Sequence, residues 1–315
     1  MRNLCLSIVI PVFNEKNNIL KIFTDIKSNL KYISDYEVIF VDDGSTDETD
    51  YEIEFLAKKE DNLRFLILQR NYGQTLAIKA GIDYSLGDNI LICDGDCQND
   101  SADFDKIIKI FLEERLDFVT GIRVLRKDNN NRIIYSKIAN FIISKIFTKK
   151  ITDLGCAVKI IKKEILKDIS FYGDTHRYLS LILANTGYSY KEVSVNHNKR
   201  MHGVSKYGFE RFFKVISDIF YLYFYFNFFS KPMHLFGLLG IGCFAGSLLS
   251  FVLMIIYKFK GISFISTPLP LIVITLLILG MLSFLLGIIA EITVRNFFHN
   301  KDIKSYLIKK YKKSV

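Results

Sequence analysis

Residues 90–100 read ILICDGDCQND and join an apolar run directly to a group of acids. Residues 90–92 have the composition of a buried strand, because apolar runs without polar interruption are typical of strands that are covered on both faces. Asp94 and Asp96 follow at once, and Gln98 comes two residues later. A core strand that ends in oxygen ligands predicts a functional site at the end of that strand.

Two earlier strands end in the same way, in VIPVFNE and VIFVDDGSTDE. Strand-like runs occupy residues 4–10, 37–41, 63–68, 89–93 and 118–120. Helix-length segments separate them, at residues 17–32, 47–59, 75–85 and 103–114. This alternation predicts an α/β domain with a mostly parallel sheet and helices on both faces. Ligands bind such sheets at the carboxyl ends of the strands, so the three acid-ended strands are expected to meet at one crevice.

Asp94, Asp96 and Gln98 together form a hard oxygen site. Carboxylate and amide oxygens in a loop suit Mg²⁺ or Mn²⁺, which take their remaining ligands from phosphate and water. A divalent cation held there would bridge a diphosphate and neutralise its charge as it leaves. The sequence therefore predicts a Mg²⁺ or Mn²⁺ site that serves a diphosphate-containing substrate.

Asp42 and Asp43 lie in a segment that also has a purely structural interpretation. Ser45 and Glu48 have the spacing of a capping box, which would open the next helix. That interpretation explains Ser45, but it does not explain two successive acids at the end of a buried strand.

Two long apolar runs predict membrane spans in the last third of the chain. Residues 233–257 and 268–290 contain no Asp, Glu, Lys or Arg, and about 20 helical residues cross a bilayer. The loop between the runs carries only Lys258 and Lys260. The tail after the runs is basic, with Arg295, Lys301, Lys304, Lys309, Lys310, Lys312 and Lys313. Since cytoplasmic flanks favour Lys and Arg, both termini are expected to be cytoplasmic.

Four segments follow from this organisation. A cytosolic domain is predicted at 1–206, and the strongly aromatic residues 207–231 are predicted to form interfacial helices on the membrane. The two spans fall within 232–292, and a basic cytosolic tail occupies 293–315. The net charge of +9 is spread over several elements without a nucleic-acid-binding motif, so no nucleic-acid partner is expected.

Several ordered motifs resemble family 2 glycosyltransferases of the GT-A fold, over residues 4 to about 230. IPVFNE, VDDGSTD and DGDCQ match that family's opening strand, nucleotide loop and metal motif in order. RNYGQTLAIKAGIDYSLGD, TGIR, TDLGCAVKIIKKE, HRYL and VNHNKRMHGVSKYG are similar to the polyprenyl-phosphate branch, which includes dolichol-phosphate mannosyltransferase. The two spans look like those of bacterial members. One departure is that Asn99, Asp100 and Ser101 replace the prolines that usually follow the metal motif, so either the loop has another shape or Asp100 assists the metal.

The resemblance implies roles for the acids of the first three strand ends. The base or ribose half of a nucleotide-sugar would be held by Pro11, Glu15, Asp42 and Asp43. Asp94, Asp96 and Gln98 would bind the metal on the diphosphate, with Asp94 and Gln98 also contacting the donor and Asp96 taking part in catalysis.

The resemblance also implies an acceptor, which is a polyprenyl phosphate of the undecaprenyl or dolichyl type. Its phosphate would be held by Arg123, Arg132, Ser136, Arg177 and Lys206, and Arg123 and Arg132 would also be catalytic. Asp153 would act as a base, orient the acceptor, or hold a turn with Gly155. A phosphomonoester is already largely ionised at neutral pH, since its second pKa is about 6. Catalysis should therefore depend mainly on positioning the acceptor phosphate, rather than on a strong general base. Direct displacement by the phosphate oxygen would invert the configuration of the anomeric carbon.

The expected reaction is transfer from a nucleotide-sugar, with a UDP-sugar favoured over GDP-mannose, to the lipid phosphate at the cytoplasmic membrane face. The product would be a lipid-linked monosaccharide for modification of a cell-envelope glycan. A processive polysaccharide synthase is disfavoured, because its Gln-x-x-Arg-Trp motif needs a Trp and this chain has none. A peripheral transferase acting on a glycan and an inactive membrane scaffold remain as alternatives. A homo-oligomer, such as a tetramer, is also expected from the resemblance.

Overall fold

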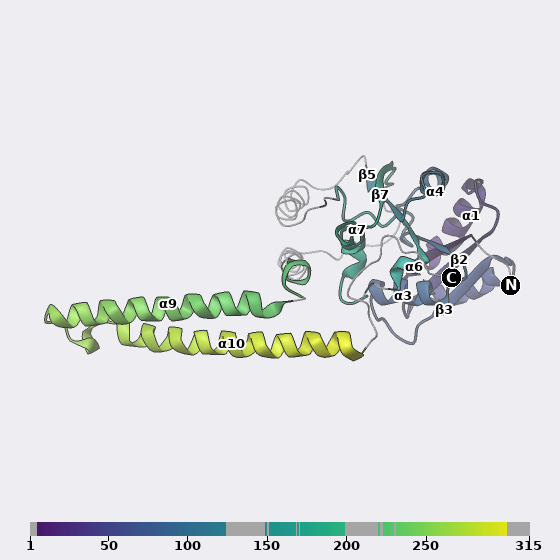
Figure 1. The fold of residues 1–315 in the computed structure, drawn as a ribbon. Helices are drawn as coiled ribbons and strands as arrows, with labels where there is room; N and C mark the ends of the chain where they lie inside the picture. Colours follow the sequence, from purple (N-terminus) through teal and green to yellow (C-terminus); the bar gives the residue numbers. More distant parts are fainter. Residues whose placement is uncertain are drawn as a thin grey trace. The chain divides into compact units, whose positions relative to one another are not determined.

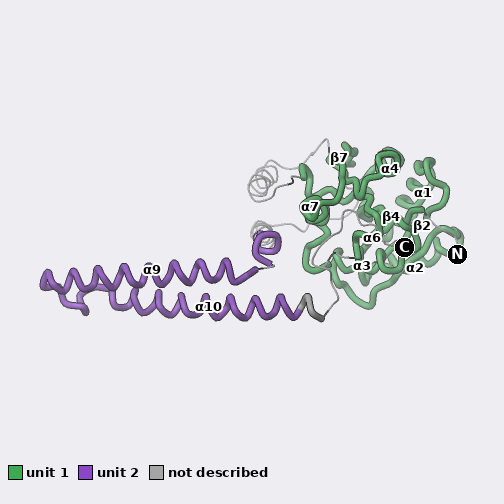
Figure 2. Tube along the Cα trace, viewed as in Figure 1, with its two compact units in different colours: residues 1–216 green, residues 217–315 purple. Residues whose placement is uncertain are grey.

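The computed structural model describes residues 5–123, 149, 151–167, 169, 171–198, 220, 223–229 and 231–300, with side chains up to residue 296. The chain divides into two compact units, residues 1–216 and residues 217–315, which are coloured separately in Figure 2.

The first unit is built on a seven-stranded sheet with the order β3-β2-β1-β4-β6-β5-β7 (Figure 1). Its strands are β1 Leu6–Val12, β2 Tyr36–Asp42, β3 Leu63–Ile67, β4 Asn89–Ile92, β5 Phe118–Arg123, β6 Lys159–Lys162 and β7 Tyr190–Val195. Six strands run in one direction, and β6 is antiparallel to both of its neighbours, β4 and β5. The predicted α/β architecture with a mostly parallel sheet is confirmed.

Helices cover both faces of this sheet, as predicted. They are α1 Ile19–Asn29, α2 Thr49–Ala57, α3 Gln74–Tyr84, α4 Phe104–Glu113, α6 Lys163–Leu166 and α7 Thr175–Thr186, with 3-10 turns η1 Lys16–Asn18 and η2 Ser101–Asp103. Helices α1, α2 and α4 bury apolar side chains against one face, in a cluster that includes Phe23, Ile53, Phe111 and Phe40 of β2. Helix α3 packs on β1 and β2 from the other face, where Gly81 lies against the side chain of Val9.

A set of buried hydrogen bonds around Glu37 lies at the amino ends of the strands. The Glu37 side chain is only 2% exposed and accepts hydrogen bonds from the Ser7 hydroxyl at 2.5 Å and the Leu86 amide at 2.6 Å. Arg64 donates to the other Glu37 oxygen at 2.8 Å. Buried carboxylates require such partners, so this group is structural and lies at the edge opposite to the predicted site.

The second unit contains two long helices, α9 Pro232–Phe259 and α10 Leu269–Asn300, joined by a loop with the 3-10 turn η3 Phe264–Ser266. They pack as a hairpin, in which a Cβ added to Gly240 would lie 2.6 Å from the Phe284 ring, and Phe244 stacks on that ring at 5.8 Å. Both helices are long and apolar enough to cross a membrane. The predicted interfacial segment lies mostly outside the described residues, although residues 223–228 are helical.

Candidate functional site

The carboxyl ends of β1, β2 and β4 lie side by side at one edge of the sheet. Val12 of β1 pairs with Asp42 of β2, and Val9 of β1 pairs with Ile92 of β4. Because these strands are parallel neighbours, the acids that follow them reach the same edge. This convergence was expected from the sequence.

Asp43 fastens the loop after β3 to the end of β2. Its carboxylate is 4% exposed, and its two oxygens accept hydrogen bonds from the amides of Tyr72 at 2.7 Å and Gly73 at 2.8 Å. Burial raises the pKa of Asp43, and the two amides oppose that shift. A Cβ added to Gly44 would lie 2.5 Å from the backbone carbon of Arg70, so the two loops also touch through their backbones.

Asp42 is buried too, and its environment corrects one sequence-based expectation. Its Oδ1 accepts hydrogen bonds from the amide and the hydroxyl of Ser45, while burial raises its pKa. Ser45 therefore makes no capping box with Glu48, which precedes α2 with φ of 66° and no side-chain cap. Asp47 accepts instead from the amide of Thr49 at 3.2 Å. The predicted capping box is wrong because Asp42 competes successfully for the Ser45 hydroxyl.

The loop after β1 carries the other residues assigned to the donor. Pro11 is the sixth residue of β1, and its carbonyl faces the loop after β4 near Gly95. Glu15 accepts a hydrogen bond from the Asn18 side chain at 2.5 Å, and its amide donates to Thr49 at 3.1 Å. These contacts join the loops after β1 and β2 into one rim beside Asp42 and Asp43.

Asp94 and Asp96 follow β4 at the middle of this edge. Asp94 is half-buried, and its Oδ1 accepts a hydrogen bond from the Gln74 side chain at 2.7 Å. Asp96 accepts from the amide of Gln98 at 3.1 Å. The Gln98 side chain itself donates to the carbonyl of Asn198 at 3.4 Å. The loop after β4 is thus held from two sides.

The donor set of this loop fits a divalent cation that is shared with a substrate. In the described part of the chain, no three His, Cys, Asp or Glu side chains gather as a complete metal cage. Two carboxylates with few further protein oxygens are typical of Mg²⁺ sites, where phosphates and waters complete the shell. Asp100 is used otherwise, because it accepts from the Ala102 amide at 3.0 Å and caps η2.

The electrostatic environment of Asp94 also favours a bound cation. Burial raises the pKa of Asp94 to about 6, and the charge of Asp96 adds to that shift, while Lys159, Gln74 and Arg123 oppose it. A bound cation stabilises a carboxylate whose charged form is disfavoured by burial and by a neighbouring negative charge.

Asp153 and Arg123 form an ion pair beside this loop. The guanidinium of Arg123 donates to both Asp153 oxygens, at 2.7 and 2.8 Å, and the Gly155 amide donates to Oδ1 at 3.1 Å. Asp153 is 3% exposed. A Cβ added to Gly155 would lie 2.6 Å from Arg123 Nη2, so this glycine leaves room for the pair. The two residues contact each other, and the charge of Arg123 also acts on Asp94 of the metal loop.

The remaining acceptor residues are only partly covered by the structure. Arg177 lies in the first turn of α7 and forms an ion pair with Asp174 at 3.0 Å. Arg132, Ser136 and Lys206 lie outside the described residues.

Two polar residues of this edge were missed by the sequence-based interpretation. Gln74 begins α3 and contacts Asp94, and Lys159 begins β6 with 4% exposure. Burial lowers the pKa of Lys159, and surrounding negative charges, Asp94 and Asp153 among them, oppose that shift. The sequence offers no signal for Lys159, because a lysine in a short strand usually faces solvent.

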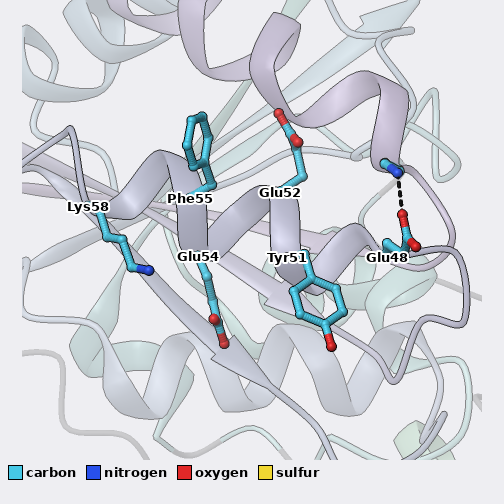
Figure 3. A pocket seen from close by; sticks show the side chains of 7 residues that line it. Glu48, Tyr51, Glu52, Glu54, Phe55 and Lys58 are labelled. Carbon is cyan, nitrogen blue, oxygen red and sulfur yellow. Dashed lines mark hydrogen bonds and ion pairs between the residues drawn. The ribbon is translucent and has the colours of Figure 1, made fainter.

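A groove of about 370 Å³ lies elsewhere, beside α2, and contains none of the predicted site residues. It is lined by Lys16, Glu48, Tyr51, Glu52, Glu54, Phe55 and Lys58. Figure 3 shows Tyr51, Glu54 and Lys58 on one side of α2 and Glu52 and Phe55 on the other. Side chains that diverge in this way do not converge on one ligand.

Solved structures share the architecture of the first unit. Mannosyl-3-phosphoglycerate synthase from Rubrobacter xylanophilus superposes with a TM-score of 0.54 at 16% identity, over 70% of this chain and 74% of that one. A mannosyltransferase from Pyrobaculum calidifontis, solved with GDP-Man and Mn²⁺, gives 0.51 at 16% identity, over 71% and 64%. The domain therefore has the GT-A glycosyltransferase fold.

The sequence places the chain more narrowly. The model of Glycosyl transferase family 2 matches residues 7–170, and the chain belongs to this family of enzymes. The dodecaprenyl-phosphate galacturonate synthase of Rhizobium johnstonii is 34% identical, over 98% of this chain and 93% of that protein. The undecaprenyl-phosphate 4-deoxy-4-formamido-L-arabinose transferase of Proteus mirabilis is 34% identical, over 68% of this chain and 66% of that protein.

Proposed function

We propose that this protein transfers a sugar from a nucleotide-sugar to the phosphate of a polyprenyl carrier, with inversion at the anomeric carbon. The observation that carries the proposal is the acidic edge where β1, β2 and β4 end, in a chain that also has two apolar helices long enough to span a membrane. The full-length similarity to a dodecaprenyl-phosphate galacturonate synthase supports the same acceptor class.

Asp94 and Asp96, with Gln98, would hold Mg²⁺ or Mn²⁺ at the end of β4. The cation, when bound, neutralises charge on the departing nucleoside diphosphate. The solved glucosyl-3-phosphoglycerate synthase of Mycobacterium tuberculosis contains Mg²⁺ and UDP, which is consistent with this chemistry on the same fold. The rim formed by Pro11, Glu15, Asp42 and Asp43 would hold the base and ribose. We favour a UDP-sugar donor over GDP-mannose.

The acceptor phosphate needs positioning rather than a strong base. Its second pKa is about 6, so its oxygen is already a nucleophile at neutral pH. Asp153 is bound by Arg123 and by the Gly155 amide, which favours an orienting role over that of a base. Arg123 and Arg177 would contact the phosphate, together with Arg132, Ser136 and Lys206, and guanidinium groups suit such contacts.

The membrane arrangement follows from the second unit. We place the catalytic domain, 1–206, and the basic tail, 293–315, on the cytoplasmic side of the inner membrane, with spans within 232–292. The aromatic segment 207–231 would lie at the bilayer surface, where a polyprenyl phosphate presents its headgroup. We also propose that the protein assembles as a homo-oligomer, for which a tetramer is the simplest expectation.

The test uses membranes that contain the full chain, several radiolabelled sugar nucleotides and polyprenyl phosphate. We expect label in the organic extract with one donor, its loss in EDTA and its recovery with Mg²⁺ or Mn²⁺. Asp96→Asn should lower the rate at least about 100-fold, since a removed electrostatic contact to the reacting charge costs about 10²–10³. Asp83→Asn, which removes an exposed carboxylate paired with Lys79, is the matched control and should keep the activity.

Two results would contradict the proposal. One is full transfer by Asp96→Asn with an authentic donor, which would favour a different site. The other is label that stays in the aqueous phase with every donor, which would favour a glycan acceptor or an inactive scaffold. The anomeric configuration of the product, read from proton coupling constants, tests the inversion.

A further inference from the structure

Lys159 brings a positive charge into the interior of the first unit. It is the first residue of β6 and pairs with Ile92 of β4 and with Thr120 of β5. Because β6 runs antiparallel to both strands, its first residue lies at the edge where they end, two residues before Asp94 along β4. The side chain is 4% exposed, and a buried ammonium is costly unless negative charges compensate it.

The hydrogen bonds of Lys159 do not supply that compensation. Its Nζ donates to the backbone carbonyl of His176 at 2.9 Å, which is a neutral acceptor. The neighbouring carboxylates that favour the charged lysine are those of Asp94 and Asp153. Asp153 is already matched by the bidentate guanidinium of Arg123. Among the groups that favour the ionised form of Asp94, the charge of Lys159 acts most strongly.

A chain of contacts also links Asp94 to the lysine. Gln74 and Thr75 are consecutive residues at the start of α3. Gln74 donates to Asp94 at 2.7 Å, while the Thr75 hydroxyl lies 2.6 Å from Nδ1 of His176. Lys159 is bound to His176 as well, so Asp94 and the ammonium group are held by one continuous set of contacts. The lysine is placed beside the metal loop in a defined position.

We propose that Lys159 is a built-in counter-charge of the divalent-cation site, which limits how tightly Asp94 and Asp96 hold the cation before the nucleotide-sugar binds. The inference rests on the proposed function, because it assumes that the carboxylate pair binds Mg²⁺ or Mn²⁺. It assigns Lys159 a positioning and charge-balancing role that acts through Asp94. If the protein alone holds the cation weakly, the cation binds together with the diphosphate of the donor and is released together with the nucleotide product.

The test measures Mn²⁺ binding to the purified full chain in detergent, without nucleotide, from the electron paramagnetic resonance signal of free Mn²⁺. Lys159→Met keeps the length of the side chain and removes its charge, and it should bind Mn²⁺ about tenfold more tightly, because it removes a unit charge that acts on Asp94 inside the protein. Lys159→Gln, which retains a donor for His176, should also tighten binding. Lys159→Arg should stay within about twofold of the unmodified protein.

The direction of the effect separates charge balance from simple damage, because a loosened site would bind Mn²⁺ more weakly. Lys162→Met is the matched control, since Lys162 ends the same strand and pairs with Asp117 at 2.7 Å, and it should leave binding unchanged. Unchanged or weaker Mn²⁺ binding in both Lys159→Met and Lys159→Gln overturns the inference. Equal binding by Asp94→Asn and the unmodified protein would instead refute the metal site of the proposed function.

Discussion

Asp94 is the residue at which burial and charge repulsion meet most directly. It is half-buried, only Gly95 separates it from Asp96 in the sequence, and its pKa is raised to about 6. A carboxylate with so strongly raised a pKa at a strand end is typical of functional sites, because a structural carboxylate is normally stabilised as an ion. Glu37 differs from Asp94 in its surroundings, because three donors contact its two oxygens at the opposite edge of the sheet.

The raised pKa of Asp94 predicts that metal binding depends on pH in a range where an ordinary Asp would show no change. The cation needs the ionised carboxylate, so protons compete with it as the pH falls through about 6. We expect the dissociation constant for Mn²⁺ to be nearly constant above pH 7 and to rise up to about tenfold per unit below pH 6. Titrations of the full chain between pH 5 and pH 8 measure this, with Mn²⁺ detected by paramagnetic resonance. A flat profile across that range would contradict the prediction.

The sequence predicts a site residue when the neighbouring residues in the chain already indicate its place in the fold. Asp42, Asp43, Asp94 and Asp96 directly follow apolar strands, so their place at the carboxyl edge could be predicted. Lys159 could not, because only its pairing with distant strands brings it there.

At the scale of elements, the first half of the domain follows the local pattern. Strands and helices up to residue 120 were predicted within a few residues, since each apolar run is separated from the next by a helix-length segment. Strands β6 and β7 and helix α7 were not predicted. Strand β6 has four residues, two of them lysines, and its burial depends on β4 and β5 on either side. Long-range pairing of this kind leaves no periodic trace in the sequence.

Gly95 shows how two elements together determine the shape of the metal loop. It lies between Asp94 and Asp96, where a Cβ would stand 2.9 Å from the carbonyl oxygen of Pro11 and closer still to the Val12 side chain. The end of β1 therefore presses on this glycine, and a larger residue would push the loop away from β1.

We expect Gly95→Ala to displace the two carboxylates and to lower the transfer rate at least about tenfold, because small misplacements of catalytic groups are costly. Mn²⁺ binding should weaken in parallel. Gly242→Ala is the matched control, since a Cβ at Gly242 meets nothing within 4 Å, and it should leave both quantities unchanged. Radiolabel transfer and Mn²⁺ titration measure the two effects. If Gly95→Ala kept full activity, the tight packing of β1 on this loop would not control the site.

For the molecule as a whole, the apolar surface of α9 and α10 decides which environment the second unit requires. Only 11% and 17% of their most apolar windows are buried within the chain. Gly240 and Gly280 let the two helices approach closely, yet Leu249, Leu271 and many other large apolar side chains remain exposed. A core helix of a soluble protein would be mostly buried, so these exposed apolar faces agree with the membrane spans that we propose.

The distribution of charge around the two helices then predicts which loops face outward. The connection between α9 and α10 carries only two basic residues, Lys258 and Lys260, whereas the tail carries many. Because cytoplasmic flanks favour Lys and Arg, the connection should lie on the outer side of the membrane and the tail on the cytoplasmic side. The test uses a variant whose native cysteines are replaced, in cells whose outer barrier has been removed but whose inner membrane is intact. Lys260→Cys should then react with a maleimide that cannot cross the inner membrane. Lys58→Cys, at the exposed residue that follows α2, should react only after lysis. The opposite pattern would put the acidic edge of the sheet on the outer side, away from cytoplasmic nucleotide-sugars, and the proposed reaction could then not use them.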